Sequence, residues 1–197
     1  MLLRNDGKTP LAKPAGVIDS SCVIALDALN LLPQLTYLFD RLLLPKAVRE
    51  DLYRRRRTKD RIKALLREYA FIDMCTGYDQ TAVDLLLIER RLKGREWPGK
   101  AEAVLQNKKD RGEAEAVVQA TERGAMVVVD EDWGRKLAER HRLDYHGTIW
   151  ILERLCELRL LAPATVRRHL VKLRELGIRF PLQAANDLLG RLGEQGI

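Results

Sequence analysis

The sequence has few of the residues that build disulfide frameworks and soft-metal sites. Its 197 residues include three cysteines and three histidines. The cysteines lie far apart in apolar surroundings, as is typical of small core residues in a reducing compartment. The histidines show no ligand spacing, so we expect neither a disulfide framework nor a zinc site.

Long hydrophobic runs are also missing. No apolar stretch is long enough to span a membrane. The first residues, MLLRNDGKTPLAKPAG, contain charges, glycine and two prolines, and they lack the apolar segment of a signal peptide. We therefore expect a soluble, cytoplasmic protein.

The chain does contain enough apolar residues for a core, and it has a surplus of positive charge. Hydrophobic residues make up 46% of the sequence and charged residues 32%, proportions that fit one globular domain. The net charge of +7 favours an anionic partner, with nucleic acid as the first candidate. A basic surface also serves solubility, so the charge alone does not decide the function.

Strands and helices are expected to alternate along the chain. Short apolar runs predict strands over 16–19, 41–45, 71–75, 125–130 and 144–147. Helical spacing predicts helices over 20–32, 46–56, 58–70, 80–94, 112–124, 132–143 and 148–161, with two more in the tail. This alternation predicts an α/β fold, in which a parallel sheet is covered by helices on both faces.

Acidic residues are expected to gather at one edge of this sheet. The predicted strands 16–19 and 125–130 end in Asp19 and Asp130. Ligands of parallel sheets bind beyond the carboxyl ends of the strands. Four acidic groups from distant parts of the sequence can meet there: Asp19, Glu50 with Asp51, Glu113 with Glu115, and Asp130 with Glu131 and Asp132.

Such a cluster needs something to neutralise it. Two carboxylates about 4 Å apart repel by roughly 4 kcal/mol at an effective dielectric constant near 20. Either bound protons or a divalent cation can offset that repulsion. Oxygen ligands favour magnesium or manganese, and such a cation can activate water for attack on a phosphodiester. Acids, a hard cation and a basic surface together indicate a nuclease.

The order of several sequence motifs resembles that of the PIN domain family. The motifs are GVIDSSCVIALDALNLL, LLLPKAVREDL, RGEAEAVVQA followed by VVVDED, and HGTIWILERL. The resemblance is to stand-alone PIN-like proteins related to toxin–antitoxin ribonucleases, and it runs from about Gly16 to the end. It implies a three-layer α/β/α fold with extra C-terminal helices, and cleavage of single-stranded RNA with Mg²⁺ or Mn²⁺. The partners that it implies are single-stranded or structured RNA, an antitoxin protein and a second copy of the chain in a homodimer.

The resemblance also implies a division of the chain and a set of site residues. Residues 1–15 would be a lead-in, 16–162 the nuclease domain, and 163–197 a helical extension packed on the same domain. The catalytic acids would be Asp19, Asp51, Glu113, Asp130 and Asp132, with Glu50 and Glu115 in reserve. All of these except Asp51 and the two reserve residues would also be metal ligands. Thr148, and Ser20 or Ser21, would support them through hydrogen bonds.

Residues 53–63 form the most basic run of the sequence. Within it, Arg54, Arg55, Arg56 and Arg57 would contact RNA phosphates, although the run also fits a solvated helix face. Trp133 follows the acidic segment and is the aromatic residue that we expect to stack on a base. Trp150, at helical spacing, fits a core position instead.

Two alternatives to a ribonuclease are open on the sequence alone. A phosphoaspartate phosphatase or receiver would need an Asp-x-Asp pair at the first strand and a lysine late in the sheet, and the chain has DSS and no such lysine. A catalytically weak nucleic-acid-binding or interaction module is the second alternative. It is favoured by Asp51, which occupies a position where the family usually has glutamate.

Overall fold

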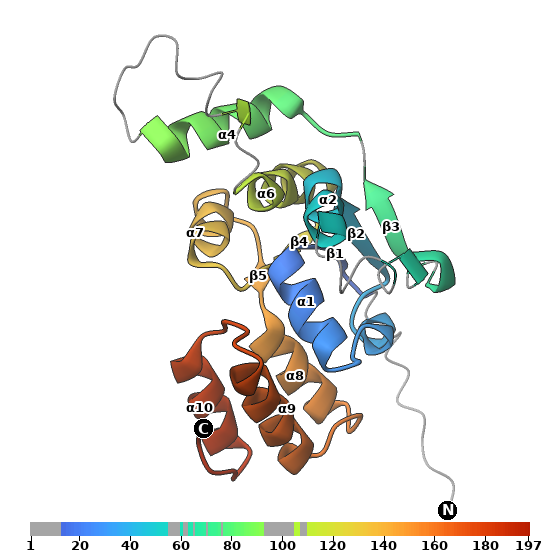
Figure 1. The fold of residues 1–197 in the computed structure, drawn as a ribbon, viewed down its shortest axis with the longest axis vertical. Coiled ribbons are helices and arrows are strands. Elements are labelled where there is room, and N and C mark those ends of the chain that lie inside the picture. Colours follow the sequence, from blue (N-terminus) through green and yellow to red (C-terminus); the bar gives the residue numbers. More distant parts are fainter. Residues whose placement is uncertain are drawn as a thin grey trace, which may run out of the picture.

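The computed structural model describes residues 13–54, 60, 63–64, 66–69, 71–75, 77–92, 105–106 and 110–197. A five-stranded parallel sheet lies at the centre, in the order β3-β2-β1-β4-β5 (Figure 1). The strands are β1 (Ala15–Ile18), β2 (Arg41–Pro45), β3 (Ile72–Cys75), β4 (Met126–Val128) and β5 (Tyr145–His146). The predicted α/β fold with a central parallel sheet is confirmed.

Helices follow the strands in the alternation expected from the sequence. The α-helices are α1 (Ser20–Ala28), α2 (Lys46–Arg54), α4 (Gln80–Leu92), α6 (Arg111–Arg123), α7 (Asp132–Arg140), α8 (Thr148–Glu157), α9 (Pro163–Glu175) and α10 (Leu182–Arg191), and a 3-10 helix, η1, spans Pro33–Tyr37. No helix in the described part of the chain is long and apolar enough to cross a membrane.

Alternate residues of the strands point to opposite faces of the sheet and build two cores. Ile18 and Val128 face a core that contains the apolar residues of α1, α8, α9 and α10. Val17 and Val127 face the other side, where α6 and α7 pack. The sheet is therefore the middle of three layers, and α4 lies outside α6 (Figure 1). Burial on both faces explains why the strands are nearly continuous apolar runs.

The strand order places a topological switch point between β1 and β4. From β1 the chain runs outward through β2 to β3, and it later returns to β4 on the other side of β1. Ile18 pairs with Val128, and the next amide, Asp19 N, donates to the Val128 carbonyl at 2.9 Å. The carboxyl ends of β1 and β4 therefore lie side by side, which is the place where parallel sheets bind ligands.

Several helices end earlier in the structure than the sequence predicts. The helix predicted over 20–32 ends at Ala28, because Asn30 has φ 58° and the amide of Leu31 turns back to Leu26. Left-handed residues, Arg142 and Arg159, also follow the ends of α7 and α8, which were predicted to reach 143 and 161. The helix predicted over 58–70 lies partly outside the described residues.

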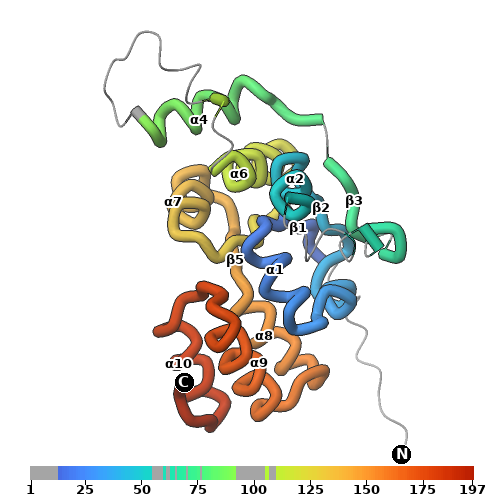
Figure 2. The backbone as a smooth tube through the Cα atoms, in the orientation of Figure 1, coloured from blue at the N-terminus to red at the C-terminus, as the bar shows by residue number. Residues whose placement is uncertain are grey.

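The C-terminal helices share the larger core with the sheet. Apolar residues of α9 and α10 belong to the cluster that contains Ile18 and α1: Val166, Leu170, Leu173, Ala185, Leu188 and Leu189. Figure 2 shows α8, α9 and α10 stacked beside one another at one end of the molecule. The boundary at residue 162 stays a prediction.

Candidate active site

Asp19 follows β1 directly and caps the N-terminus of α1. Its Oδ2 accepts hydrogen bonds from the Ser21 amide at 3.1 Å and the Ser21 hydroxyl at 2.8 Å. The residue is only 2% exposed. Burial raises the pKa of Asp19 above its ordinary value, although the hydrogen bonds from Ser21 and Ser20 act in the opposite direction. Of the two serines, Ser21 provides the hydroxyl contact.

Asp130, two residues after β4, is held from three directions. Its Oδ1 accepts from the Thr148 amide at 3.0 Å, and its Oδ2 accepts from the Thr148 hydroxyl at 2.6 Å. The thiol of Cys22 donates to Oδ2 at 3.3 Å, and Arg135 Nη2 lies 3.5 Å from Oδ1. Both carboxylate oxygens of Asp130 therefore have protein partners. Sequence reasoning selected Thr148 but missed Cys22 and Arg135.

Gly147 allows Thr148 to approach Asp130 so closely. A Cβ added at Gly147 would collide with Asp130 Oδ1, and it would lie 2.7 Å from Arg135 Nη2 and 3.0 Å from the Val129 carbonyl oxygen. The first of these contacts is far inside van der Waals distance. A residue with a side chain would therefore push the N-terminus of α8 away from the end of β4.

Glu113, in the first turn of α6, lies beside Asp19. Burial raises the pKa of Glu113 to about 8, and repulsion from Asp19 is the next cause, followed by smaller contributions from Asp110 and Glu131. Gly112, the residue before Glu113, permits this approach because it has no side chain. A Cβ at this position would lie 3.3 Å from Asp19 Oδ1. Asp19 and Glu113 thus form a pair of repelling carboxylates at the sheet edge.

Glu131 belongs to the predicted acidic cluster, but it is not among the predicted catalytic acids or metal ligands. It is exposed, and its charge acts on both Asp19 and Glu113. The neighbouring Asp132, in the first turn of α7, is exposed as well. Asp130, Glu131 and Asp132 line one side of a cavity of about 350 Å³. The segment from Asp130 to Asp132 therefore acts on Asp19 and Glu113 through Glu131, and it also lines an open cavity.

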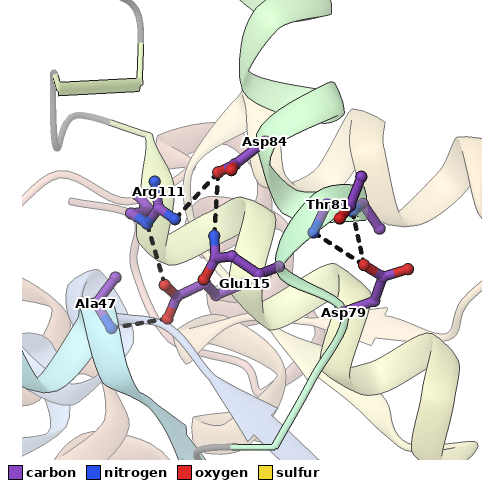
Figure 3. Close-up of polar contacts among 8 residues, drawn as sticks. Ala47, Asp79, Thr81, Asp84, Arg111 and Glu115 are labelled. Carbon is purple, nitrogen blue, oxygen red and sulfur yellow. Dashed lines mark hydrogen bonds and ion pairs between the residues drawn. The ribbon is translucent and has the colours of Figure 1, made fainter. Parts of the chain in front are cut away.

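Glu115 lies in a different environment from Glu113. It is 2% exposed, and it accepts from the Ala47 amide at 2.8 Å and from Arg111 Nε at 3.3 Å (Figure 3). Arg111 also reaches Asp84 at 3.1 Å. Burial and the hydrogen bond with Glu115 raise the pKa of Tyr78. The Glu115 carboxylate thus joins α6 to the N-terminus of α2, where a negative charge is favourable.

The PIN domain family model matches residues 15–194. The chain belongs to the PIN domain family. PIN domains are generally nucleases and are typically metal-dependent. A comparison with curated proteins found no match.

In this PIN domain, Val48 is the residue of α2 that lies near Asp19 and Glu113. A Cβ at Gly112, the glycine that faces Asp19, would lie 3.1 Å from Val48 Cγ2. Asp51 lies about one turn further along α2 and pairs with Arg54 at 3.2 Å. Glu50 lines a groove together with Glu115. The catalytic roles of Asp51 and Glu50 stay predictions.

The residues predicted to contact RNA are described only in part. Arg54 is exposed and lines the same groove as Glu50, whereas Arg55, Arg56 and Arg57 lie outside the described residues. Trp133, in the first turn of α7, packs against apolar residues of α4 and α6, and the guanidinium of Arg90 lies 4.8 Å from its ring centroid. A base that stacked on this face of Trp133 would have to displace Arg90. Trp150 packs against the larger core.

The acids of this PIN domain fit a hard cation by their chemistry. Within the described residues, no three side chains of His, Cys, Asp or Glu are already gathered as a metal site. Mg²⁺, however, commonly uses one or two carboxylates and keeps several waters. Asp19 and Glu113 are two such carboxylates, and they repel one another when both are ionised. These two side chains therefore suit a partly hydrated cation.

Proposed function

We propose that this PIN domain is a metal-dependent endonuclease of single-stranded RNA. The observation that carries the proposal is the pairing of Asp19 with Glu113 at the switch point of the sheet, where burial and repulsion raise the pKa of Glu113 to about 8. The net charge of +7 supports an anionic substrate. The toxin role, the antitoxin partner and the homodimer are further proposals that rest on the resemblance alone.

Each acid has a separate part in this proposal. Asp19 and Glu113 would hold the cation, and Glu131 lies within electrostatic reach of both. When bound, Mg²⁺ or Mn²⁺ supplies an activated water and stabilises charge on the phosphate. With its pKa raised to about 8, Glu113 favours the protonated form at neutral pH, and it would release this proton to act as a metal ligand. Asp130 also fixes the end of β4 against α8 through its hydrogen bonds with Thr148 and Cys22. The metal-ligand roles of Asp130 and Asp132 stay part of the proposal.

The first experiment compares RNA cleavage by the wild type and by Asp19→Asn. A mixed panel of single-stranded RNAs is incubated with Mn²⁺, Mg²⁺ or EDTA. We expect cleavage that requires the metal and that Asp19→Asn abolishes, since asparagine can still cap α1 but carries no charge. Asp187→Asn, on the exposed face of α10, is the matched control and should cleave as the wild type does. Equal activity of the wild type and Asp19→Asn would indicate a contaminating nuclease and refute the proposal.

The second candidate function is an RNA-binding module with weak catalysis. It is favoured by the lack of a preassembled three-carboxylate site in the described part of the chain, and by the ion pair between Asp51 and Arg54. Such a module would bind RNA equally well in EDTA and in Mn²⁺ and would leave it intact. Metal titration during the cleavage assay separates the two functions.

A further inference from the structure

The cavity beside the acidic segment has a second wall, which comes from the C-terminal helices. Asp130, Glu131 and Asp132 form one side, and Arg179, Phe180 and Pro181 form the other. These last three residues connect α9 to α10, and the connection lies close to the beginning of α7 (Figure 2). Residues about 50 positions apart in the sequence therefore line the same open cavity of about 350 Å³.

The backbone on both sides of Arg179 is anchored. Gly177, with φ 67°, follows the C-cap of α9, and the amide of Ile178 donates to the Leu173 carbonyl at 3.0 Å. Ile178 and Phe180 are partly buried and pack against the larger core. Arg179 lies between them and is exposed, as expected for an extended segment with alternating sides. Its position beside the acids is thus set by packed neighbours and by the helix ends.

Arg179 has no ion pair or side-chain hydrogen bond within the described residues, although three acids line the same cavity. Arg135 differs, because it lies 3.5 Å from Asp130 and also donates to the Val129 carbonyl. The guanidinium of Arg179 therefore keeps its donors available to a ligand. A guanidinium presents a planar fork of donors that matches the oxygens of a phosphate.

We propose that Arg179 binds a backbone phosphate of the RNA next to the phosphate at the acidic edge. This inference rests on the proposed function, because it assigns a contact of the same substrate. An RNA strand meets repulsion from Asp130, Glu131 and Asp132 as it crosses the carboxyl edge of the sheet. Arg179 offsets that repulsion from the opposite wall and holds the strand in the cavity. The C-terminal helices thereby complete the substrate site as well as the core.

The test measures RNA binding without cleavage. Fluorescein-labelled mixed-sequence single-stranded RNA is titrated with Asp19→Asn, and with the same protein that also carries Arg179→Ala, Arg179→Lys or Arg174→Ala, over a range of KCl concentrations. Arg174 is the matched control, because it is an exposed arginine of α9 that does not line the cavity. The melting temperature of each variant verifies that it is folded.

We expect Arg179→Ala to weaken binding about tenfold at low salt, the loss of one charge-assisted contact. The slope of log K against log salt should fall in magnitude by about 0.7, the contribution of one phosphate on a single strand. Arg179→Lys should keep the slope, and Arg174→Ala should keep both affinity and slope. The binding assay is independent of catalysis, so these results would support the contact even if the wild type proved unable to cleave RNA.

Three results would overturn the assignment. An unchanged affinity and slope for Arg179→Ala would show that the residue does not contact RNA. Tighter Mn²⁺ binding by Arg179→Ala with unchanged RNA binding would make Arg179 a counter-charge for the acids. Equal losses for Arg179→Ala and Arg174→Ala would indicate a diffuse basic surface without a specific contact. An acidic protein as the ligand of Arg179 would be the next hypothesis in the first case.

Discussion

Thr148 donates two hydrogen bonds to Asp130, one from its backbone amide at 3.0 Å and one from its hydroxyl at 2.6 Å. Thr148 is fully buried, and Asp130 is 8% exposed. The pair joins the first residue of α8 to the segment that follows β4. It therefore couples the position of the acidic segment to α8, which packs in the larger core together with α9 and α10.

Thr148→Val removes the hydroxyl and keeps the shape of the side chain. We expect a loss of about 1.5–3 kcal/mol in the free energy of unfolding, since a buried carboxylate loses a charge-assisted donor. In a chain of this length that loss lowers the melting temperature by about 2–4 °C for each kcal/mol. Thr148→Ser keeps the donor and should lose less. Thermal melting of both variants and the wild type measures these losses. Equal melting temperatures for Thr148→Val and the wild type would contradict the prediction.

Gly147→Ala tests whether the close approach to Asp130 depends on glycine. The added Cβ meets Asp130 Oδ1 and Arg135 Nη2, so the N-terminus of α8 must shift. We expect a destabilisation on the order of 2–3 kcal/mol, as for other overpacked sites, together with reduced cleavage.

The matched substitution is Gly190→Ala in α10, where a Cβ would meet nothing within 4 Å. Alanine is the better helix former, so this variant should gain on the order of 0.5–1 kcal/mol. Chemical denaturation of both proteins provides the comparison. A Gly147→Ala protein as stable as Gly190→Ala would show that the N-terminus of α8 can move without cost.

The strands and the two aspartates at their ends could be predicted because they depend on local patterns. Apolar runs predicted the strands, and the rule for parallel sheets places Asp19 and Asp130 at one edge. Helix ends were predicted less well. Left-handed Arg142 and Arg159 follow the ends of helices, and arginine gives no local signal for this conformation, whereas Asn30 is a residue type that can end a helix.

Other parts of the site depend on tertiary packing that no local pattern encodes. Glu131 acts electrostatically on Asp19, which depends on the packing of the end of β4 beside the end of β1. Arg179 reaches the acids only through the packing of α9 and α10. The different surroundings of Glu113 and Glu115 could have been inferred from the sequence. Side chains two positions apart on a helix point in directions that differ by about 200°.

Glu113→Gln should make stability less dependent on pH in the absence of metal. The folded protein keeps the Glu113 proton up to about pH 8, whereas the unfolded chain releases it near the ordinary value of 4.5. The folded state binds more protons over this interval, so the free energy of unfolding of the wild type falls as the pH rises from about 4.5 to about 8. Glutamine has no proton to release and removes this decline.

The measurement is the melting temperature in EDTA at pH 5 and pH 8. We expect Glu113→Gln to gain on the wild type at the higher pH, and added Mn²⁺ to stabilise the wild type more than the variant. Glu175→Gln, on the exposed end of α9, controls for the loss of a carboxylate elsewhere. A constant difference between Glu113→Gln and the wild type across this pH range would contradict the raised pKa.

Glu115→Ala should lower the stability of the protein but leave RNA cleavage intact, in contrast to Glu113→Gln. The substitution leaves the Ala47 amide and Arg111 without their shared acceptor, and breaking such a buried pair costs about 2–4 kcal/mol. Because the Glu115 oxygens face α2 and Arg111, cleavage by the folded protein should continue at a rate close to that of the wild type, whereas Glu113→Gln should lose it. Cleavage assayed well below the melting temperature of each variant separates the two glutamates. Loss of activity in a folded Glu115→Ala protein would place Glu115 in the catalytic set and remove the distinction drawn from the geometry of α6.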